Sequence, residues 1–236
     1  DWLATEFVQN GWSIKKLHRL ILTSTVYRQS SVGNEAGLRA DPEDQLLWRM
    51  PPRRLEAEVI RDAVLETAGT LDFQMYGEPV PTDTKASGEV APKDEECEGR
   101  RSVYQIVRRS APQSFLNAFD APIMETNCTR RTVSTTATQA LAFLNSDFLT
   151  AQARHFAKRV LKQEHSAQMS ESATLEYAFR LAMTRRPNPE ESLILARFLQ
   201  TQTDHYANLP AEERQLRVFA DLCQSLLGAN EFVYVD

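Results

Sequence analysis

The chain contains few residues of the types that mark several common protein classes. Its 236 residues include only 8 glycines and 3 cysteines. The cysteines, Cys97, Cys128 and Cys223, form no C-x-x-C or C-x-x-C-H pattern, so neither zinc binding nor covalent haem attachment is expected in this chain. Their odd number excludes a fully paired disulfide framework. The four histidines form no H-E-x-x-H motif. We therefore predict no metal site and no cofactor within this chain.

Long apolar runs and an excess of positive charge are also absent. No run of about 18 apolar residues is present, so no membrane span is expected. The formal net charge of −5 argues against nucleic-acid binding, because a phosphate-binding surface needs a basic excess. The chain begins with Asp1 and has no basic, apolar leader, which suggests a C-terminal fragment of a larger protein.

The residues that are abundant favour helices. Apolar residues make up 42% of the chain, glycine is scarce, and helix-forming types are common. Apolar spacing and cap residues predict helices at about 1–9, 13–28, 41–50, 54–68, 112–119, 136–145, 148–162, 172–184, 189–202 and 210–227. We predict an all-α, mostly antiparallel multi-helix domain spanning 1–236, with at most one or two short extended segments.

Two segments depart from the helical pattern. Residues 102–107 alternate loosely and are the expected extended strand. Residues 77–99 are rich in proline, glycine and acidic side chains with little to bury, which predicts a mobile acidic insertion rather than a second domain.

The most polar stretch that lies between apolar anchors runs from 100 to 149. There Arg130 and Arg131 precede Ser134 and Thr135 at an expected helix start. Free backbone N–H groups, hydroxyls and guanidinium groups suit a carboxylate, sulfate or phosphate. The same pattern fits a purely structural role, in which a hydroxyl caps the helix and each arginine pairs with a nearby acid. Two further ligand-binding candidates, Arg108 and Arg109, fit either interpretation.

Three residues are candidates for catalysis. Asp120 and Glu125 could supply the two carboxylates of a glycoside hydrolase, although both also suit arginine partners. Cys128 could be a nucleophile in the positive field of the arginine pair, or a buried apolar filler. Several aromatic side chains could form a sugar-stacking platform or belong to the core: Trp2, Trp12, Trp48, Tyr104, Phe115 and Phe119.

Four blocks of the sequence resemble one known family. They are DWLATEFVQNGWSIKKLHRLILTSTVYRQSS, WRMPPRRLEAEVIRDAVLETAGTLD, FDAPIMETNCTRRTVSTTATQALAFLNSDFL and DLCQSLLGANEFVYVD. In this order they resemble the C-terminal domain of unknown function found in large secreted proteins abundant in planctomycetes. Ala137 and Ile123 depart from that resemblance, since proline and an acid are frequent there.

The resemblance implies a context. In such proteins the domain follows a second uncharacterised domain, and often a cytochrome-c-like domain that carries its own haem c. Members look exported to the periplasm or cell surface, occur in genomes rich in sulfatases and polysaccharide-degrading enzymes, and are often encoded beside a second secreted protein. The resemblance carries over no catalytic residues.

Together these observations predict an accessory, ligand-binding or interaction domain of a large exported bacterial protein, linked to polysaccharide use or surface redox assembly. Its expected partners are the upstream domains of the same polypeptide, a co-encoded secreted protein, or an acidic or sulfated glycan. The alternative is an extracytoplasmic enzyme that acts on an acidic or sulfated sugar. The sequence leaves open whether the chain is an enzyme.

Overall fold

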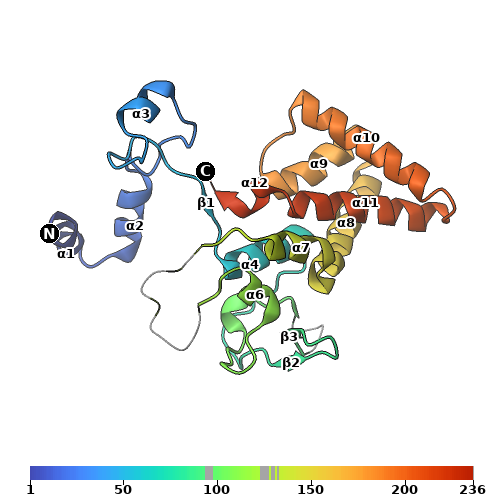
Figure 1. The fold of residues 1–236 in the computed structure, drawn as a ribbon, viewed down its shortest axis with the longest axis horizontal. Coiled ribbons are helices and arrows are strands. Elements are labelled where there is room, and N and C mark those ends of the chain that lie inside the picture. The colour runs from blue at the N-terminus through green and yellow to red at the C-terminus, as the bar shows by residue number, and fades with distance from the viewer. Residues whose placement is uncertain (94–97, 123–127, 129–130, 132, 236) are drawn as a thin grey trace. The chain divides into compact units, whose positions relative to one another are not determined.

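The computed structural model describes residues 1–93, 98–122, 128, 131 and 133–235 (Figure 1). The chain forms two compact units, one of Asp1–Arg53 with Tyr234–Asp236 and a larger one of Arg54–Val233. Helices dominate the described residues, which confirms the predicted all-α class. In this described part of the chain, no helix combines the length and apolar character needed to cross a membrane. One domain over 1–236 stays a prediction.

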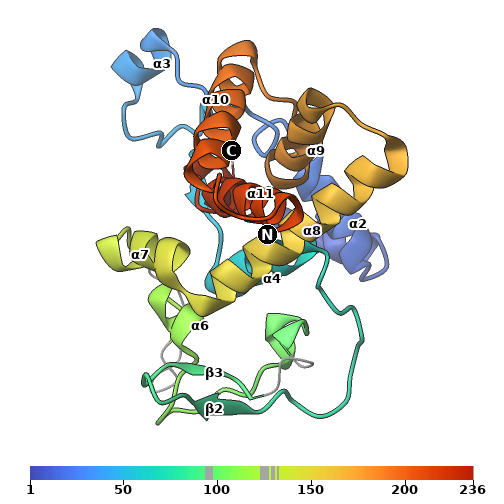
Figure 2. The same ribbon diagram turned by 90° about the vertical axis from the view of Figure 1, so that its right-hand side faces the viewer.

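The larger unit is a helical assembly built around its longest helix. Its helices are α4 (Ala57–Ala68), α6 (Ser114–Ala118), α7 (Ala137–Asn145), α8 (Asp147–Ala167), α9 (Glu171–Met183), α10 (Pro189–His205), α11 (Ala211–Leu227) and α12 (Asn230–Val233). Helix α8 packs against both α4 and α11, as Figure 2 shows. The contacts between these helices bury Ile60, Val64, Leu65, Leu149, Phe156, Val160, Leu222 and Leu227.

Local signals set the ends of these helices. Asn188 and Glu191 form a reciprocal capping box at the start of α10, where Pro189 occupies the first turn. Thr136 and Gln139 form the same box at the start of α7. Gly69 ends α4 with a φ of 78°, a left-handed conformation that glycine adopts without the steric cost of a Cβ. These start and stop positions agree with the sequence-based prediction.

The segment predicted as an acidic insertion contains a short hairpin. Strand β2 (Thr82–Thr84) pairs antiparallel with β3 (Val90–Pro92), with Thr82 opposite Pro92. Val80, Thr82 and Val90 are buried, so this part of the insertion does contribute to the packed interior. Residues 94–97 lie outside the described residues. The predicted mobility of 77–99 stays a prediction.

The prediction of a strand at 102–107 was wrong for its first three residues. Ser102–Tyr104 form a single 3₁₀ turn. The physical cause is the carboxylate of Asp62, which accepts hydrogen bonds from the Ser102 backbone N–H at 2.8 Å and from its hydroxyl at 2.7 Å. Only Gln105 makes a strand-like contact, a parallel bridge to Val80. A tertiary acceptor therefore overrides the local alternation.

The smaller unit holds three helices with no fully buried residue. They are α1 (Trp2–Gln9), α2 (Ile14–Leu22) and α3 (Glu35–Ala40), and β1 (Arg53–Arg54) pairs with β4 (Tyr234–Val235). The Ser13 hydroxyl caps α2 by accepting the Lys16 N–H at 3.4 Å. Trp12 packs edge-on against Phe7 with ring centroids 5.4 Å apart.

The helix predicted from Asp41 is absent, and α3 lies just before that position instead. The Asp41 carboxylate accepts the N–H groups of Gln45 at 3.0 Å and Leu46 at 2.7 Å, which closes a turn rather than starting a helix. Trp48 packs directly on Gly37, where an added Cβ would lie 2.5 Å from the indole ring. The close ring contact explains why α3 carries a glycine.

Phe156 gives a direct test of the core. It is fully buried in α8, so Phe156→Ala should lower the free energy of unfolding by about 3–5 kcal/mol through lost transfer energy and a cavity. Leu193→Ala, on the exposed side of α10, is the matched control and should cost less than about 0.5 kcal/mol. Urea unfolding followed by far-ultraviolet circular dichroism measures both. Equal effects would contradict the assigned core.

Candidate functional site

A groove of about 690 Å³ runs along α4 in the larger unit. Its other walls are residues 101–109 and the chain on both sides of α6. Part of the lining is aliphatic, with Val59, Val103, Ile106, Val107 and Leu116. Charged residues also line the groove: Glu56, Glu58, Asp62, Arg101, Arg108, Arg109 and Arg131. An apolar groove with a few converging charges is the usual form of a ligand site.

Two acidic side chains hold Arg131 in this groove: Glu58 on α4 and Glu56 at the N-cap of α4. Its guanidinium donates to both carboxylate oxygens of Glu58, at 2.5 and 3.1 Å. Glu56 lies 3.3 Å from the same guanidinium. Burial alone would raise the pKa of Glu58, but the hydrogen bonds from Arg131, a backbone hydrogen bond and the charge of Arg131 together outweigh it, so the pKa lies below its usual value. Glu58 is therefore an ionised partner and not a proton donor.

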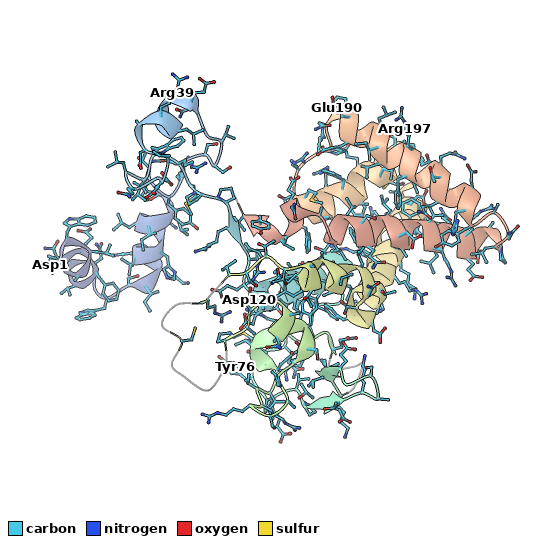
Figure 3. All side chains as sticks on the ribbon, in the orientation of Figure 1. Asp1, Arg39, Tyr76, Asp120, Glu190 and Arg197 are labelled. Carbon is cyan, nitrogen blue, oxygen red and sulfur yellow. The ribbon has the colours of Figure 1, made fainter. Side chains whose placement is uncertain are left out.

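Asp120 is the centre of a second cluster, which joins α6, α7 and the chain before α4 (Figure 3). Its carboxylate accepts hydrogen bonds from Arg54 at 2.6 Å and from the Ser134 N–H and hydroxyl, both at 2.8 Å. Gln139 donates to the same carboxylate at 3.4 Å. Arg54 is almost fully buried and also donates to the carbonyl oxygens of Phe119 and Ser134. This cluster ties three segments together and does not line the groove.

The environment of Asp120 fixes its protonation state. Burial would raise its pKa, but the Ser134 and Arg54 hydrogen bonds lower it below the usual aspartate value. A general acid needs the opposite shift. Asp120 is therefore positioned as a structural anion, and its φ of 64° places it in a left-handed turn at the end of α6.

Arg61 on α4 is a third, fully buried arginine. It donates to the carbonyl oxygen of Arg100 at 2.9 Å and to the Ser102 hydroxyl at 3.3 Å, and also to the carbonyl oxygen of Glu98. Its guanidinium lies 5.3 Å from the Phe148 ring centroid. Burial lowers the pKa of Arg61 to about 10, so it stays charged at neutral pH. These contacts hold the 98–102 segment, and with it one wall of the groove, against α4.

The groove brings together some of the predicted ligand-binding residues. Arg131, Arg108 and Arg109 all line it. Arg108 and Arg109 are exposed and make no hydrogen bond or ion pair with any residue that the structure describes. Ser134 is instead part of the Asp120 cluster, and Thr135 is exposed next to the α7 cap without lining the groove. The capping box at Thr136 uses the N-terminal end of α7, where the sequence predicted free N–H groups.

Of the other candidates that the structure describes, neither Cys128 nor the aromatic residues line the groove. Cys128 is an exposed free thiol, and no histidine is among the described residues that line the groove. Arg130 and Glu125 lie outside the described residues. Phe115 and Phe119 are buried in the core with their ring centroids 4.9 Å apart, as one of the two sequence interpretations expected. Within the described ranges, no group of three or more histidine, cysteine or acidic side chains is placed to hold a metal ion.

The sequence interpretation missed the aliphatic lining of the groove. The sequence placed Val103, Ile106 and Val107 in an expected strand and assigned them to no site, whereas Val103 and Val107 are exposed in the groove. The only indication of this in the sequence was the arginine pair at 108 and 109, which directly follows these residues and is of a type usually exposed to solvent. Nothing local indicated that Val59 on α4 would face the same space.

Comparison with known proteins places the chain in one family. The family model described as "PSD1: Protein of unknown function (DUF1553)" matches residues 1–199, and the chain belongs to that family. No curated protein and no solved structure gives a significant match. The family assignment agrees with a domain of unknown function and assigns no activity to the groove.

Replacing the central carboxylate tests the Asp120 cluster. Asp120→Asn keeps the shape but removes the charge that faces the buried Arg54, so it should cost about 1.5–3 kcal/mol of stability at pH 7. Because the folded-state pKa of Asp120 is lowered, its contribution is complete above the unfolded-state value of about 4 and is lost as pH falls below it. The stability difference between wild type and Asp120→Asn should therefore be constant from about pH 5 to 7 and shrink below about pH 4.

Urea unfolding at several pH values measures that difference. A gap that grows on acidification would contradict the lowered pKa. Glu190→Gln is a suitable control, because this exposed carboxylate at the start of α10 has no ion pair with any described residue and should show no such pH dependence.

Proposed function

We propose that this domain is an accessory binding module, and that its groove takes an anionic ligand. The observation that carries the proposal is the pair Arg108 and Arg109, which line an aliphatic groove without a partner among the described residues. The three acids among the described residues that line the groove are already engaged: Glu56 and Glu58 by Arg131, and Asp62 by Ser102. The charge left open to a ligand is therefore positive.

Arginine suits this role for geometric reasons. Its planar guanidinium donates two parallel hydrogen bonds to a carboxylate, sulfate or phosphate, and it is more weakly hydrated than lysine. Two adjacent arginines beside an apolar surface can bind an anionic group while the rest of the ligand covers the valine side chains. This arrangement fits the acidic or sulfated ligands expected from the sequence.

Binding is better supported than catalysis. An enzyme that hydrolyses an acidic or sulfated sugar would need a carboxylic acid that is protonated near neutral pH. The pKa values of Glu58 and Asp120 are both shifted the other way, and Asp120 does not line the groove. The enzymatic alternative is therefore the less favoured proposal.

The sequence resemblance suggests where such a module works. We propose that it belongs to a large exported protein of the planctomycete type, in which an upstream domain carries haem c. Acidic or sulfated glycans, or a co-encoded secreted protein, would then be the available ligands. The four blocks that carry the resemblance are the support for this context.

The smaller unit supports a second role, in docking to other domains of the same polypeptide. Helices α1 and α2 bury none of their residues, and Trp2 and Trp12 are 67% and 68% exposed. Ile14 and Leu22 on α2 are also exposed. These exposed apolar side chains on two neighbouring helices and the link between them support the proposal, because exposed apolar surface that gathers in one place usually marks a protein contact.

Thermal melting against a panel of anions tests the groove. Sulfate, phosphate, galacturonate oligomers, sulfated oligosaccharides and acidic peptides are compared at equal ionic strength with sodium chloride. A ligand at about 100 times its Kd should stabilise the protein by about 2.7 kcal/mol and raise the melting temperature. The double variant Arg108→Ser with Arg109→Ser should abolish that rise.

The matched control is Arg154→Ser with Arg197→Ser, two exposed arginines on α8 and α10 outside the groove. Its ligand-induced rise should equal that of wild type. A panel in which no anion stabilises the folded protein, or in which both double variants lose the effect equally, would refute the proposed site.

A further inference from the structure

Three valines that line the groove are more exposed than valines in a packed hydrophobic core. Val59 on α4 is 46% exposed, and Val103 and Val107 on the opposite wall are 69% and 63% exposed. All three line the same groove. A ligand that covered them would gain roughly 25 cal/mol for each Å² of apolar surface removed from water. The groove therefore favours a ligand with apolar groups of its own.

The kind of apolar lining separates a polypeptide from a sugar. Sugar rings usually stack on flat aromatic faces, and no aromatic side chain is among the described residues that line this groove. Phe115 and Phe119, which are close in sequence, face the core instead. Branched aliphatic side chains pack well against valine, leucine or isoleucine side chains, so a polypeptide segment matches this lining better than a glycan.

The backbone of the groove wall is also suited to binding a polypeptide. Gln105 is extended, with φ −78° and ψ 140°. The chain there pairs on one side with Val80, whose N–H donates to the Tyr104 carbonyl oxygen at 2.7 Å and whose carbonyl oxygen accepts from Ile106 at 3.0 Å. Successive N–H groups of an extended chain point to opposite sides. Val107 follows this paired stretch, and its N–H and carbonyl bond to no residue that the structure describes.

An unpaired extended edge beside apolar side chains is the arrangement by which many domains add a peptide strand. Main-chain hydrogen bonds supply affinity, and alternate side chains of the peptide enter the groove. Here the peptide side chains would meet Val103 and Val107, and the open positive charge of Arg108 and Arg109 would select carboxylates.

The geometry points to an extended polypeptide segment that carries both aliphatic side chains and carboxylates on the face turned to the protein as the occupant of this groove. The inference rests on the proposed function, because it names the chemical class of the anionic ligand. The segment would pair along the free edge at Val107, place its aliphatic side chains on the three valines, and set its carboxylates against Arg108 and Arg109.

A synthetic peptide tests this directly. The probe is an acetylated and amidated octapeptide of two leucines followed by two glutamates, repeated once, so that each face of the extended peptide carries both residue types. It bears a terminal fluorophore, is titrated with the full chain and is followed by fluorescence anisotropy. Three comparison peptides have serine for leucine, lysine for glutamate, or N-methyl groups on alternate residues. We expect saturable binding of the probe, and binding at least about tenfold weaker for each comparison peptide. The N-methylated peptide matters most, because only strand pairing requires those N–H groups.

Matched variants locate the binding. Val107→Ser and Arg108→Ser should each weaken probe binding about tenfold. Their controls are Ile194→Ser and Arg197→Ser, which change the same kinds of exposed side chain on α10, outside the groove. These controls should bind the probe as wild type does. Equal weakening by Val107→Ser and Ile194→Ser would overturn the inference.

The outcomes separate the two proposals. Three results together would support the anionic groove and refute the polypeptide inference: a sulfated oligosaccharide binds, Arg108→Ser abolishes that binding, and no peptide binds. If neither peptides nor glycans bind the folded chain, both fail. Binding of the serine-substituted peptide as strong as the probe would reduce the interaction to charge alone and also overturn the polypeptide inference.

Discussion

The buried guanidinium of Arg61 is the constraint on which the candidate site depends. A buried cation is tolerated only when its donors are satisfied, and here the partners are carbonyl oxygens of the 98–100 segment and the Ser102 hydroxyl. The next residue, Asp62, holds the N–H and hydroxyl of Ser102. One turn of α4 thus fixes the path of a chain segment about 40 residues away. The groove wall follows from that attachment.

Two groups of arginines can be distinguished once their contacts are known. Arg54, Arg61 and Arg131 are bound to carbonyl or carboxylate oxygens of the protein. Arg108 and Arg109 have no such partner among the described residues. The first group supports the structural interpretation that the sequence left open, and the second group carries the proposal of a ligand. The same residue type therefore serves folding in one place and is available for binding in another.

Most of the helices could be predicted because their signals are local. The cap at Asn188, the cap at Thr136 and the stop at Gly69 each act within one helical turn. The predictions failed where a side chain competes with the local pattern. The carboxylate of Asp41 closes a turn in place of a helix, and that of Asp62 bends the expected strand into a 3₁₀ turn. Such acceptors are ordinary aspartates in the sequence.

The sequence by itself determined the helical class, most helix ends and, over residues 1–199, the family. The tertiary structure alone decided which charges are paired and where the groove lies. The reason is separation along the chain: Arg54 meets Asp120 across 66 residues, and Arg131 meets Glu58 across 73. Local periodicity carries no information over such distances. The exposed Val59, Val103 and Val107 become one surface only because Arg61 and Asp62 of α4 hold the chain at 100–102 beside that helix.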